Sequence, residues 1–355
     1  MTYILTYHQV MPTFLDFLFP FGRQAYQRDF HFSGFRHETR LEPNISQGLQ
    51  LPQIQRSGRD IRMCYNLKSV EPSNSQPDWP WSIRQTAVYH SFDVQTKTST
   101  WIIVKGSQLM KRRIESATGP GGLRAFRDFS NNSKSLAASL SIHLMIADWC
   151  AENWRWYISF LEESLQDKTR RTLAVNVESP QSPVQEKPFL APTLTISSTQ
   201  HQKPTFRSRT SSFLQKYSSF ASSHKPKIPD HPGIPPGPPS LTNEMALNPT
   251  DFQFVDLQRI QLFEDKSNEM LLILELNVNV LSELKEYYQS VTTSEHWPDE
   301  PETECRTDIA HFKNRLTSIT KDLEMQQSRT KTLLRVIADR KSLVRDQNSS
   351  LLLSS

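Results

Sequence analysis

The sequence has few cysteines, and no two of them are spaced for a metal or a redox reaction. The three thiols lie far apart, at Cys64, Cys150 and Cys305. An odd number of cysteines cannot all form disulfides within one chain, and there is no Cys-x-x-Cys motif. We therefore expect a reducing environment, and a cytoplasmic location for the chain as given.

Long apolar runs are also missing. A membrane-spanning helix needs about 20 apolar residues, and the best candidate, 270–281, is much shorter. Three polar residues interrupt it: Glu275, Asn277 and Asn279. Residues 1–21 are apolar, but they lack a cationic start and contain Asp16, unlike a signal peptide. We expect no direct membrane span, and we interpret 1–21 as the first buried piece of a domain.

Catalytic motifs are missing as well. The chain has no GxSxG, HExxH, Walker or GxGxxG sequence, so we predict that it is not an enzyme and has no catalytic or cofactor-binding residues. The nearest approach to a metal site is His31 and His37 beside Glu38, which lacks a further converging donor. The net charge of +4 and the short basic cluster at 111–113 do not indicate a nucleic-acid partner.

The first part of the chain has the pattern of a mixed domain. Strand-like runs occupy 61–70, 86–94 and 100–105, and the polar stretch between the last two predicts a hairpin. From 135 to 168, apolar residues recur every three or four positions, which predicts one aromatic-rich helix. We expect His143 and Cys150 to fill the packing of that helix. The predicted α/β (α+β) domain covers residues 1–175.

Residues 176–248 have the composition of a disordered linker. More than half of the 23 prolines lie between 178 and 249, among many serines. A plain tether is the favoured interpretation. Docking of 235–239 into an aromatic groove as a polyproline helix is the alternative.

The last part of the chain predicts two long stalk-like helices that pack antiparallel, over 249–347, with a disordered tail at 348–355. The first runs from about Pro249 to Val291, the second starts near Asp308, and a short acidic turn joins them. Each helix carries an apolar stripe with the spacing of a coiled-coil seam. The predicted packing residues are Leu257, Ile260, Leu271, Leu274, Leu281, Ile309, Phe312, Leu316, Ile319, Leu323, Leu333 and Ile337.

Several short blocks carry a family resemblance. In the first domain they lie at 6–12 (TYHQVMP), 14–17 (FLDF), 19–22 (FPFG), 32–36 (FSGFR), 81–90 (WSIRQTAVYH) and 101–106 (WIIVKG). In the helices they lie at 256–261 (DLQRIQ), 323–327 (LEMQQ) and 339–343 (DRKSL). With these blocks the chain resembles the fungal CorA-like transporter-domain proteins, relatives of the CorA divalent-cation channels.

The resemblance implies a cytosolic α/β domain followed by stalk helices. It also implies Mg²⁺ or another divalent cation as ligand. The apolar stripe from Ile309 to Val344 further predicts a homo-oligomer that associates through the helices, although a hairpin within one chain could also bury this stripe. Relatives with membrane spans are expected at the cytosolic face of a membrane. This sequence has no spans and no Gly-Met-Asn pore signature, so we do not expect it to transport ions by itself, and no metal-binding residue carries over.

Two alternatives stay open. The sequence is expected to be either a truncated gene model of a protein in this group or a genuine soluble paralogue. The competing function is a soluble scaffold or regulatory module with no ion linkage, which would hold partners through the proline-rich segment and the helix faces.

Overall fold

The computed structural model describes residues 2–22, 32–42, 50–76, 79–105, 108–122, 131–173, 254–297 and 303–354. Contacts divide the chain into two units, one of residues 1–174 and 252–355 and one of residues 175–251. All the described residues belong to the first unit, so the predicted linker at 176–248 lies outside them. The predicted domain at 1–175 and the predicted hairpin at 249–347 share this one unit.

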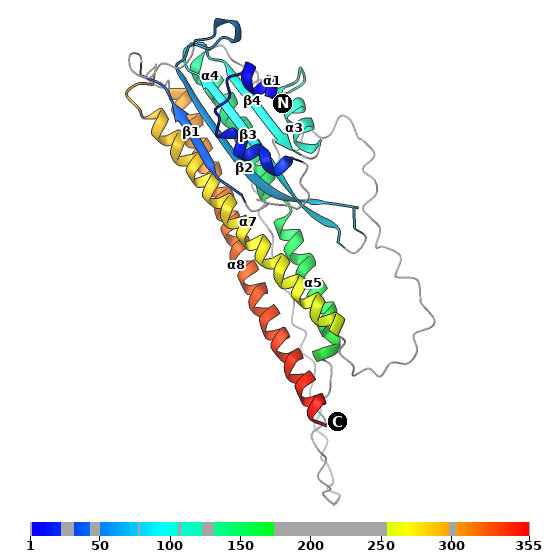
Figure 1. The fold of residues 1–355 in the computed structure, drawn as a ribbon. Coiled ribbons are helices and arrows are strands. Elements are labelled where there is room, and N and C mark those ends of the chain that lie inside the picture. Colours follow the sequence, from blue (N-terminus) through cyan, green and yellow to red (C-terminus); the bar gives the residue numbers. More distant parts are fainter. Residues whose placement is uncertain are drawn as a thin grey trace, which may run out of the picture. The chain divides into compact units, whose positions relative to one another are not determined.

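Four antiparallel strands form one sheet in the order of the sequence (Figure 1). The strands are β1 (Phe35–Thr39), β2 (Asp60–Pro72), β3 (Trp81–Asp93) and β4 (Ser99–Lys105). The three predicted strands and the β3–β4 hairpin are confirmed. In the hairpin turn, Asp93 accepts hydrogen bonds from the amides of Gln95 and Thr96. β1 was not predicted, because its side chains do not alternate cleanly between apolar and polar.

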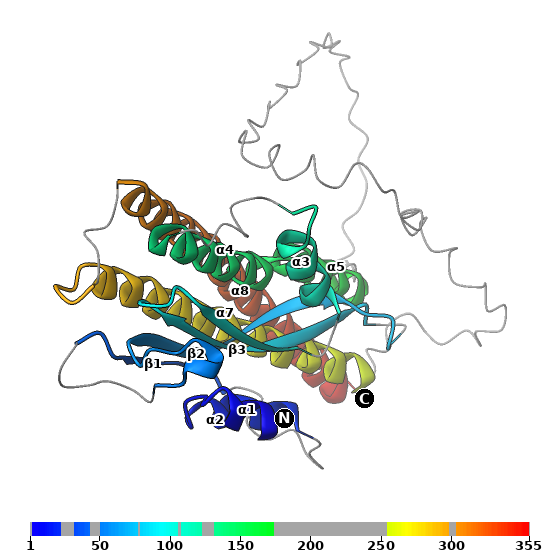
Figure 2. The same ribbon diagram turned by 90° about the horizontal axis from the view of Figure 1, so that it is seen from above.

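The sheet is covered on both faces, and Figure 2 shows the helices on either side of it. On the inner face, alternate residues of β2 such as Met63 and Tyr65 join the main hydrophobic cluster with the long helices. On the outer face, Cys64 and Tyr89 join a smaller cluster with Phe14 and Phe17. β2 is therefore buried on both of its faces.

The first residues are only partly the buried piece that we predicted. α1 (Thr2–Tyr7) buries none of its side chains, whereas α2 (Phe14–Leu18) buries Phe14 and Phe17. A single 3₁₀ turn, Phe19–Phe21, follows α2. The outer face of the sheet is therefore covered mainly by the aromatic side chains of α2.

The single helix predicted at 135–168 is wrong. It consists of two helices, α4 (Asn132–Ala151) and α5 (Trp154–Leu173), which follow the short α3 (Leu109–Thr118). At the break, Asn153 adopts a left-handed conformation with φ of 67°. Asparagine is among the few residues that tolerate this conformation, and its Nδ2 donates to the carbonyl of Val70 at 2.9 Å. That bond attaches the break to β2.

We predict that Asn153→Ala destabilises the protein by about 2–3 kcal/mol. Alanine in the left-handed region costs about 1–2 kcal/mol, and the lost hydrogen bond adds about 1 kcal/mol. Asn153→Gly removes only the hydrogen bond and should cost about 1 kcal/mol. Urea unfolding of both variants measures the difference. Equal losses would mean that the backbone conformation at this break contributes nothing.

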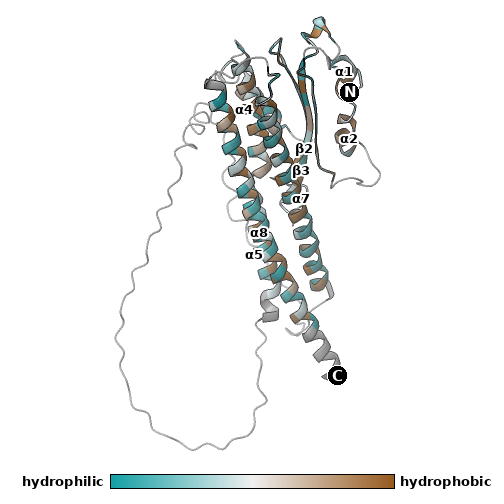
Figure 3. Ribbon diagram, turned by 90° about the vertical axis from the view of Figure 1, so that its left-hand side faces the viewer, coloured by the Kyte–Doolittle hydropathy of each residue, from teal (hydrophilic) through white to brown (hydrophobic). Residues whose placement is uncertain are grey.

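Two long helices complete the unit, α7 (Phe254–Thr292) and α8 (Thr303–Ser354). They run antiparallel, as predicted (Figure 1). The helical backbone of α8 continues to Ser354, where the sequence predicted a disordered tail from 348. Hydrophobic and hydrophilic residues alternate along both helices (Figure 3). No helix within the described stretches is long and apolar enough to cross a membrane.

Candidate functional site

The inner face of the sheet meets the helices around two buried histidines. His143 of α4 and His90 of β3 are both 0% exposed. His143 Nδ1 lies 2.8 Å from the hydroxyl of Tyr65 on β2, and its Nε2 lies 2.9 Å from the hydroxyl of Tyr288 on α7. The two imidazoles are 3.1 Å apart, from His143 Nε2 to His90 Nδ1. We call Tyr65, His90, His143 and Tyr288 the histidine–tyrosine cluster.

The cluster continues through serines to the edge strand. His90 Nε2 lies 2.9 Å from Ser99 Oγ on β4, which lies 3.1 Å from Ser139 Oγ on α4. Ser139 in turn donates to the carbonyl of Ser135. Trp101 stacks on His90, with ring centroids 4.0 Å apart. Hydrogen bonds thus connect three strands with two helices inside the core.

One arrangement of protons satisfies the whole cluster. Tyr65 donates to His143 Nδ1, and His143 Nε2–H donates to Tyr288. Tyr288 then donates to His90 Nδ1 at 3.3 Å, and His90 Nε2–H donates to Ser99. Both imidazoles are neutral in this arrangement, each with its proton on Nε2.

Burial keeps the cluster neutral. Removal from water lowers the pKa of His90 to about 3, and burial with the neighbouring His90 lowers the pKa of His143 well below its usual value. Burial also raises the pKa values of Tyr65 and Tyr288 well above their usual value. A fully buried, neutral and hydrogen-bonded network connects the sheet rigidly to the helices.

A second buried contact joins α7 to the sheet. β1 pairs with residues 61–65 of β2 only, so the same side of β2 lacks a strand partner farther along, at Lys68. Asn277 fills that place. Its Oδ1 accepts from the amide of Lys68 at 3.0 Å, and its Nδ2 donates to the carbonyl of Lys68 at 2.7 Å. A single side-chain amide thus pairs both backbone groups of a buried strand residue.

By contrast, three ion pairs that join α8 to other helices lie at partly exposed positions. Arg315 binds Asp148 of α4 at 2.5 Å, and Lys341 binds Glu264 of α7 at 2.6 Å. The third pair joins Arg329 to Glu162 of α5, with 3.0 Å between Nε and Oε1. Pairs with this much solvent contact contribute little to stability, about 0–1 kcal/mol each. α8 is therefore held mainly by its apolar stripe.

The predicted packing residues of the two apolar stripes are covered by other parts of the chain. Leu257, Leu271 and Ile309 are partly buried. The others are buried: Ile260, Leu274, Leu281, Phe312, Leu316, Ile319, Leu323, Leu333 and Ile337. α8 contacts α7, α4 and α5, so this stripe is already occupied within one chain. Self-association through the helices stays a prediction.

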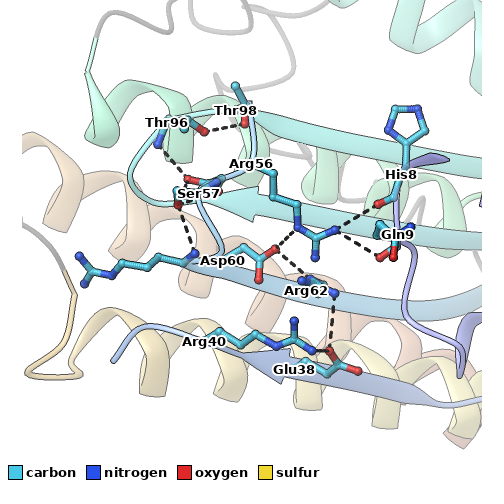
Figure 4. Close-up of polar contacts among 12 residues, drawn as sticks. His8, Gln9, Glu38, Arg40, Arg56, Ser57, Asp60, Arg62, Thr96 and Thr98 are labelled. Atoms are coloured by element: carbon cyan, nitrogen blue, oxygen red, sulfur yellow. Dashed lines mark hydrogen bonds and ion pairs between the residues drawn. The ribbon is translucent and has the colours of Figure 1, made fainter. Parts of the chain in front are cut away.

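The outer face carries a charged cluster near the start of β2 (Figure 4). Asp60 Oδ2 accepts from Arg56 Nε at 3.1 Å and from Arg62 Nε at 2.9 Å. Arg56 also reaches the carbonyls of His8 and Gln9, at 3.4 and 3.5 Å. Asp60 and the two arginines are all buried. The pairs therefore attach the end of α1 to the sheet.

Asp60 is unusually placed within this cluster. Its Oδ1 is buried without a hydrogen-bond partner, as is Nη2 of Arg62. Burial raises the pKa of Asp60 to about 6, although the neighbouring Arg56 and Arg40 oppose the shift. The cluster therefore gains or loses a proton near neutral pH, unlike the histidine–tyrosine cluster.

A cavity borders the charged cluster. Its volume is about 560 Å³, and it is lined by Gln50, Pro52, Gln55, Arg56, Ser57, Gln95 and Thr96.

The residues that came nearest to a metal site in the sequence do not form one. His37 and Glu38 do not converge, because adjacent residues of a strand point to opposite faces. The ring of His37 packs against the ring of Tyr287, and Glu38 pairs with Arg40. His31 lies outside the described residues, which contain no group of three or more donors arranged for a metal.

Reasoning from the sequence predicted the burial of His143 but missed its partners. It also took Asn277 only as an interruption of an apolar run. A polar residue that recurs within an apolar helical stripe is a usable signal for a buried hydrogen bond. The sequence does not identify the partner of that bond, since Lys68 lies 209 positions away along the chain.

Comparison with known proteins supports one relation. No curated protein and no solved structure matches the chain. A family model described as CorA-like transporters matches residues 1–173, which hold the sheet together with α1 to α5. This match supports a relation of the chain to the CorA-like transporter superfamily.

Proposed function

We propose that this chain is the cytosolic, non-enzymatic portion of a CorA-like divalent metal-ion transport protein, with Mg²⁺ as the preferred ion. The family match over residues 1–173 carries the proposal. In this role the chain responds to the ion at the cytosolic face of a membrane and does not itself form the pore. We propose the fungal CorA-like transporter-domain proteins as relatives of this chain.

The contacts of the helices support a conformational mechanism. α7 is attached to the sheet through Tyr288 and Asn277, both buried and both in hydrogen bonds with strand residues. Three ion pairs of α8 with other helices are partly exposed, so a small displacement of α8 that breaks them costs little. We infer that α7 moves with the sheet and that α8 is the element that responds. An ion would be sensed if its binding favoured one of two packings of α8 against the sheet and α7.

The proposal predicts that millimolar Mg²⁺ stabilises the full chain. A ligand that binds only the folded state at about 100 times its Kd adds about 2.7 kcal/mol. At about 2–4 °C per kcal/mol, the melting temperature should rise by several degrees. The measurement is a thermal unfolding scan in MgCl₂, with NaCl of equal ionic strength as the control for screening.

The alternative function, a scaffold or regulatory module without ion linkage, makes the opposite prediction. The scaffold would show the same melting temperature in MgCl₂ and in NaCl. An equal rise in both salts would also count against ion sensing, because ionic strength alone then accounts for it.

A further inference from the structure

The cavity beside the charged cluster has a polar lining with one positive charge. Besides Pro52 and Arg56, its lining consists of the side-chain amides of Gln50, Gln55 and Gln95 and the hydroxyls of Ser57 and Thr96. Amides and hydroxyls both donate and accept hydrogen bonds. None of these lining residues is acidic or aromatic. The lining is therefore suited to an anion whose remaining part is polar and not aromatic.

The guanidinium group of Arg56 has one nitrogen to spare for a ligand. Arg56 is only 8% exposed. Its Nε donates to Asp60, and its Nη1 donates to the carbonyls of His8 and Gln9 (Figure 4). Within the described part of the chain, Nη2 has no hydrogen-bond partner, yet it is not among the fully buried atoms that lack one. Because Arg56 is otherwise covered and lines the cavity, we infer that Nη2 directs its N–H groups there.

The charged cluster leaves a positive charge at this point. Asp60 is shared by Arg56 and Arg62, and Glu38 is shared by Arg40 and Arg62. Three guanidinium groups thus face two carboxylates. Since Arg56 is the member of this cluster that lines the cavity, an anion bound there would balance the charges.

Asp93 is a further carboxylate behind the lining, and backbone amides stabilise its charge. It accepts from the amides of Ser57, Gln95 and Thr96 at 2.7, 3.0 and 2.8 Å. These bonds join the two loops that line the cavity, and Thr96 Oγ1 adds a bond of 2.6 Å to the carbonyl of Gln55. The loops are therefore fixed before a ligand binds, which lowers the entropic cost of binding.

We propose that this cavity binds a small phosphorylated polyol, such as a sugar phosphate, with the phosphate on Arg56. Phosphate oxygens form strong charge-assisted hydrogen bonds with a guanidinium group. The hydroxyls of a polyol match the amides and hydroxyls of the lining, whereas a nucleobase would find no aromatic ring on which to stack. The volume of about 560 Å³ lies within the usual range of small-molecule sites and exceeds what an inorganic anion fills.

Isothermal titration calorimetry on the full chain tests the proposal, with glucose 6-phosphate as the probe. We expect glucose 6-phosphate to bind with a Kd below about 1 mM, and inorganic phosphate to bind about tenfold more weakly. Glucose should give no binding heat at the same concentrations, because it lacks the group that Arg56 recognises. The titrations contain no Mg²⁺, so this proposal and the proposed ion response can fail separately.

One added negative charge locates the site. Gln95→Glu places a carboxylate in the lining at an exposed turn position, so the fold should tolerate it. The Kd for glucose 6-phosphate should rise by about tenfold through repulsion of the phosphate. Gln258→Glu, at an exposed position of α7 outside the lining, makes the same change in net charge and should leave the Kd unchanged.

Four results would overturn the proposal. The first is no binding of glucose 6-phosphate, and the second is equal binding of glucose, which would exclude recognition of the phosphate. The third is inorganic phosphate that binds as tightly as the sugar phosphate, because the cavity would then hold an adventitious ion only. The fourth is an equal effect of Gln95→Glu and Gln258→Glu, which would place the bound anion elsewhere or attribute its binding to net charge alone.

Discussion

Asn277→Leu should lower the free energy of unfolding by about 2–4 kcal/mol. The substitution leaves both the amide and the carbonyl of Lys68 buried without a partner, at about 1–3 kcal/mol for each unsatisfied group. Leucine has the branched shape of asparagine but is larger, so the substitution leaves no cavity and overpacking adds to the loss. Urea unfolding at neutral pH, followed by circular dichroism, measures the change.

The same helix supplies a control. Asn279 lies two positions along α7 and is exposed, so Asn279→Leu should change the unfolding free energy by no more than about 0.5 kcal/mol. If both variants lose the same amount, helix propensity or solubility explains the effect, and the bond to β2 does not. A loss confined to Asn277→Leu shows that α7 is attached to the sheet through this side chain.

The second large effect is a loss of stability in mild acid. His90 and His143 have pKa values below the usual value of about 6.5, so the unfolded chain takes up protons that the folded chain refuses. Their contribution is complete above pH 6.5 and falls as the pH drops toward the folded-state values. For His90 alone, with a folded pKa of about 3, the loss at pH 5 is about 2 kcal/mol. His143 acts in the same direction.

Asp60 opposes this loss. Its folded pKa of about 6 exceeds the usual value of 3.8, so the folded chain takes up this proton first and gains stability as the pH falls through 6. The gain at pH 5 is about 1.4 kcal/mol. Asp60→Asn removes it, so this variant should lose stability between pH 7 and pH 5 more steeply than the unaltered chain.

Urea unfolding at pH 7, 6 and 5 separates the two effects. His90→Gln should be less stable at pH 7 but should show a flatter dependence on pH. The variant lacks one imidazole that takes up a proton in the unfolded chain but not in the folded chain. An Asp60→Asn variant that keeps its pH 7 stability at pH 5 would show that neither histidine resists protonation in the folded chain.

The helices illustrate what periodicity can predict. The spacing of Leu316, Ile319 and Leu323 correctly indicates which face of α8 is buried. It carries no information on what covers that face, and here α4, α5 and α7 of the same chain cover it. A seam with coiled-coil spacing is compatible with packing inside one chain and with packing between chains, so self-association through the helices stays a prediction.

The polar contacts show a different limit. The break at Asn153 was missed because asparagine also occurs within helices, and only the tertiary bond to Val70 selects its left-handed conformation. Tyr65, His90, His143 and Tyr288 come from four elements that are distant in the sequence. Each is an ordinary residue in its own segment. A network of this kind exists only once the elements are packed, which local patterns do not describe.

The order of elements along the chain has a consequence for how the protein is made. The main cluster includes Tyr65 and Trp149 from the first half, and Leu281 and Phe312 from α7 and α8. Residues 174–253 separate these halves, and a ribosome adds about 5–20 residues per second. For several seconds the inner face of the nascent sheet is therefore covered only by α4 and α5, without α7 and α8. A fragment that stops at Leu173, although it spans the family match, would lack the cover that α7 and α8 give and should require a chaperone to stay dispersed.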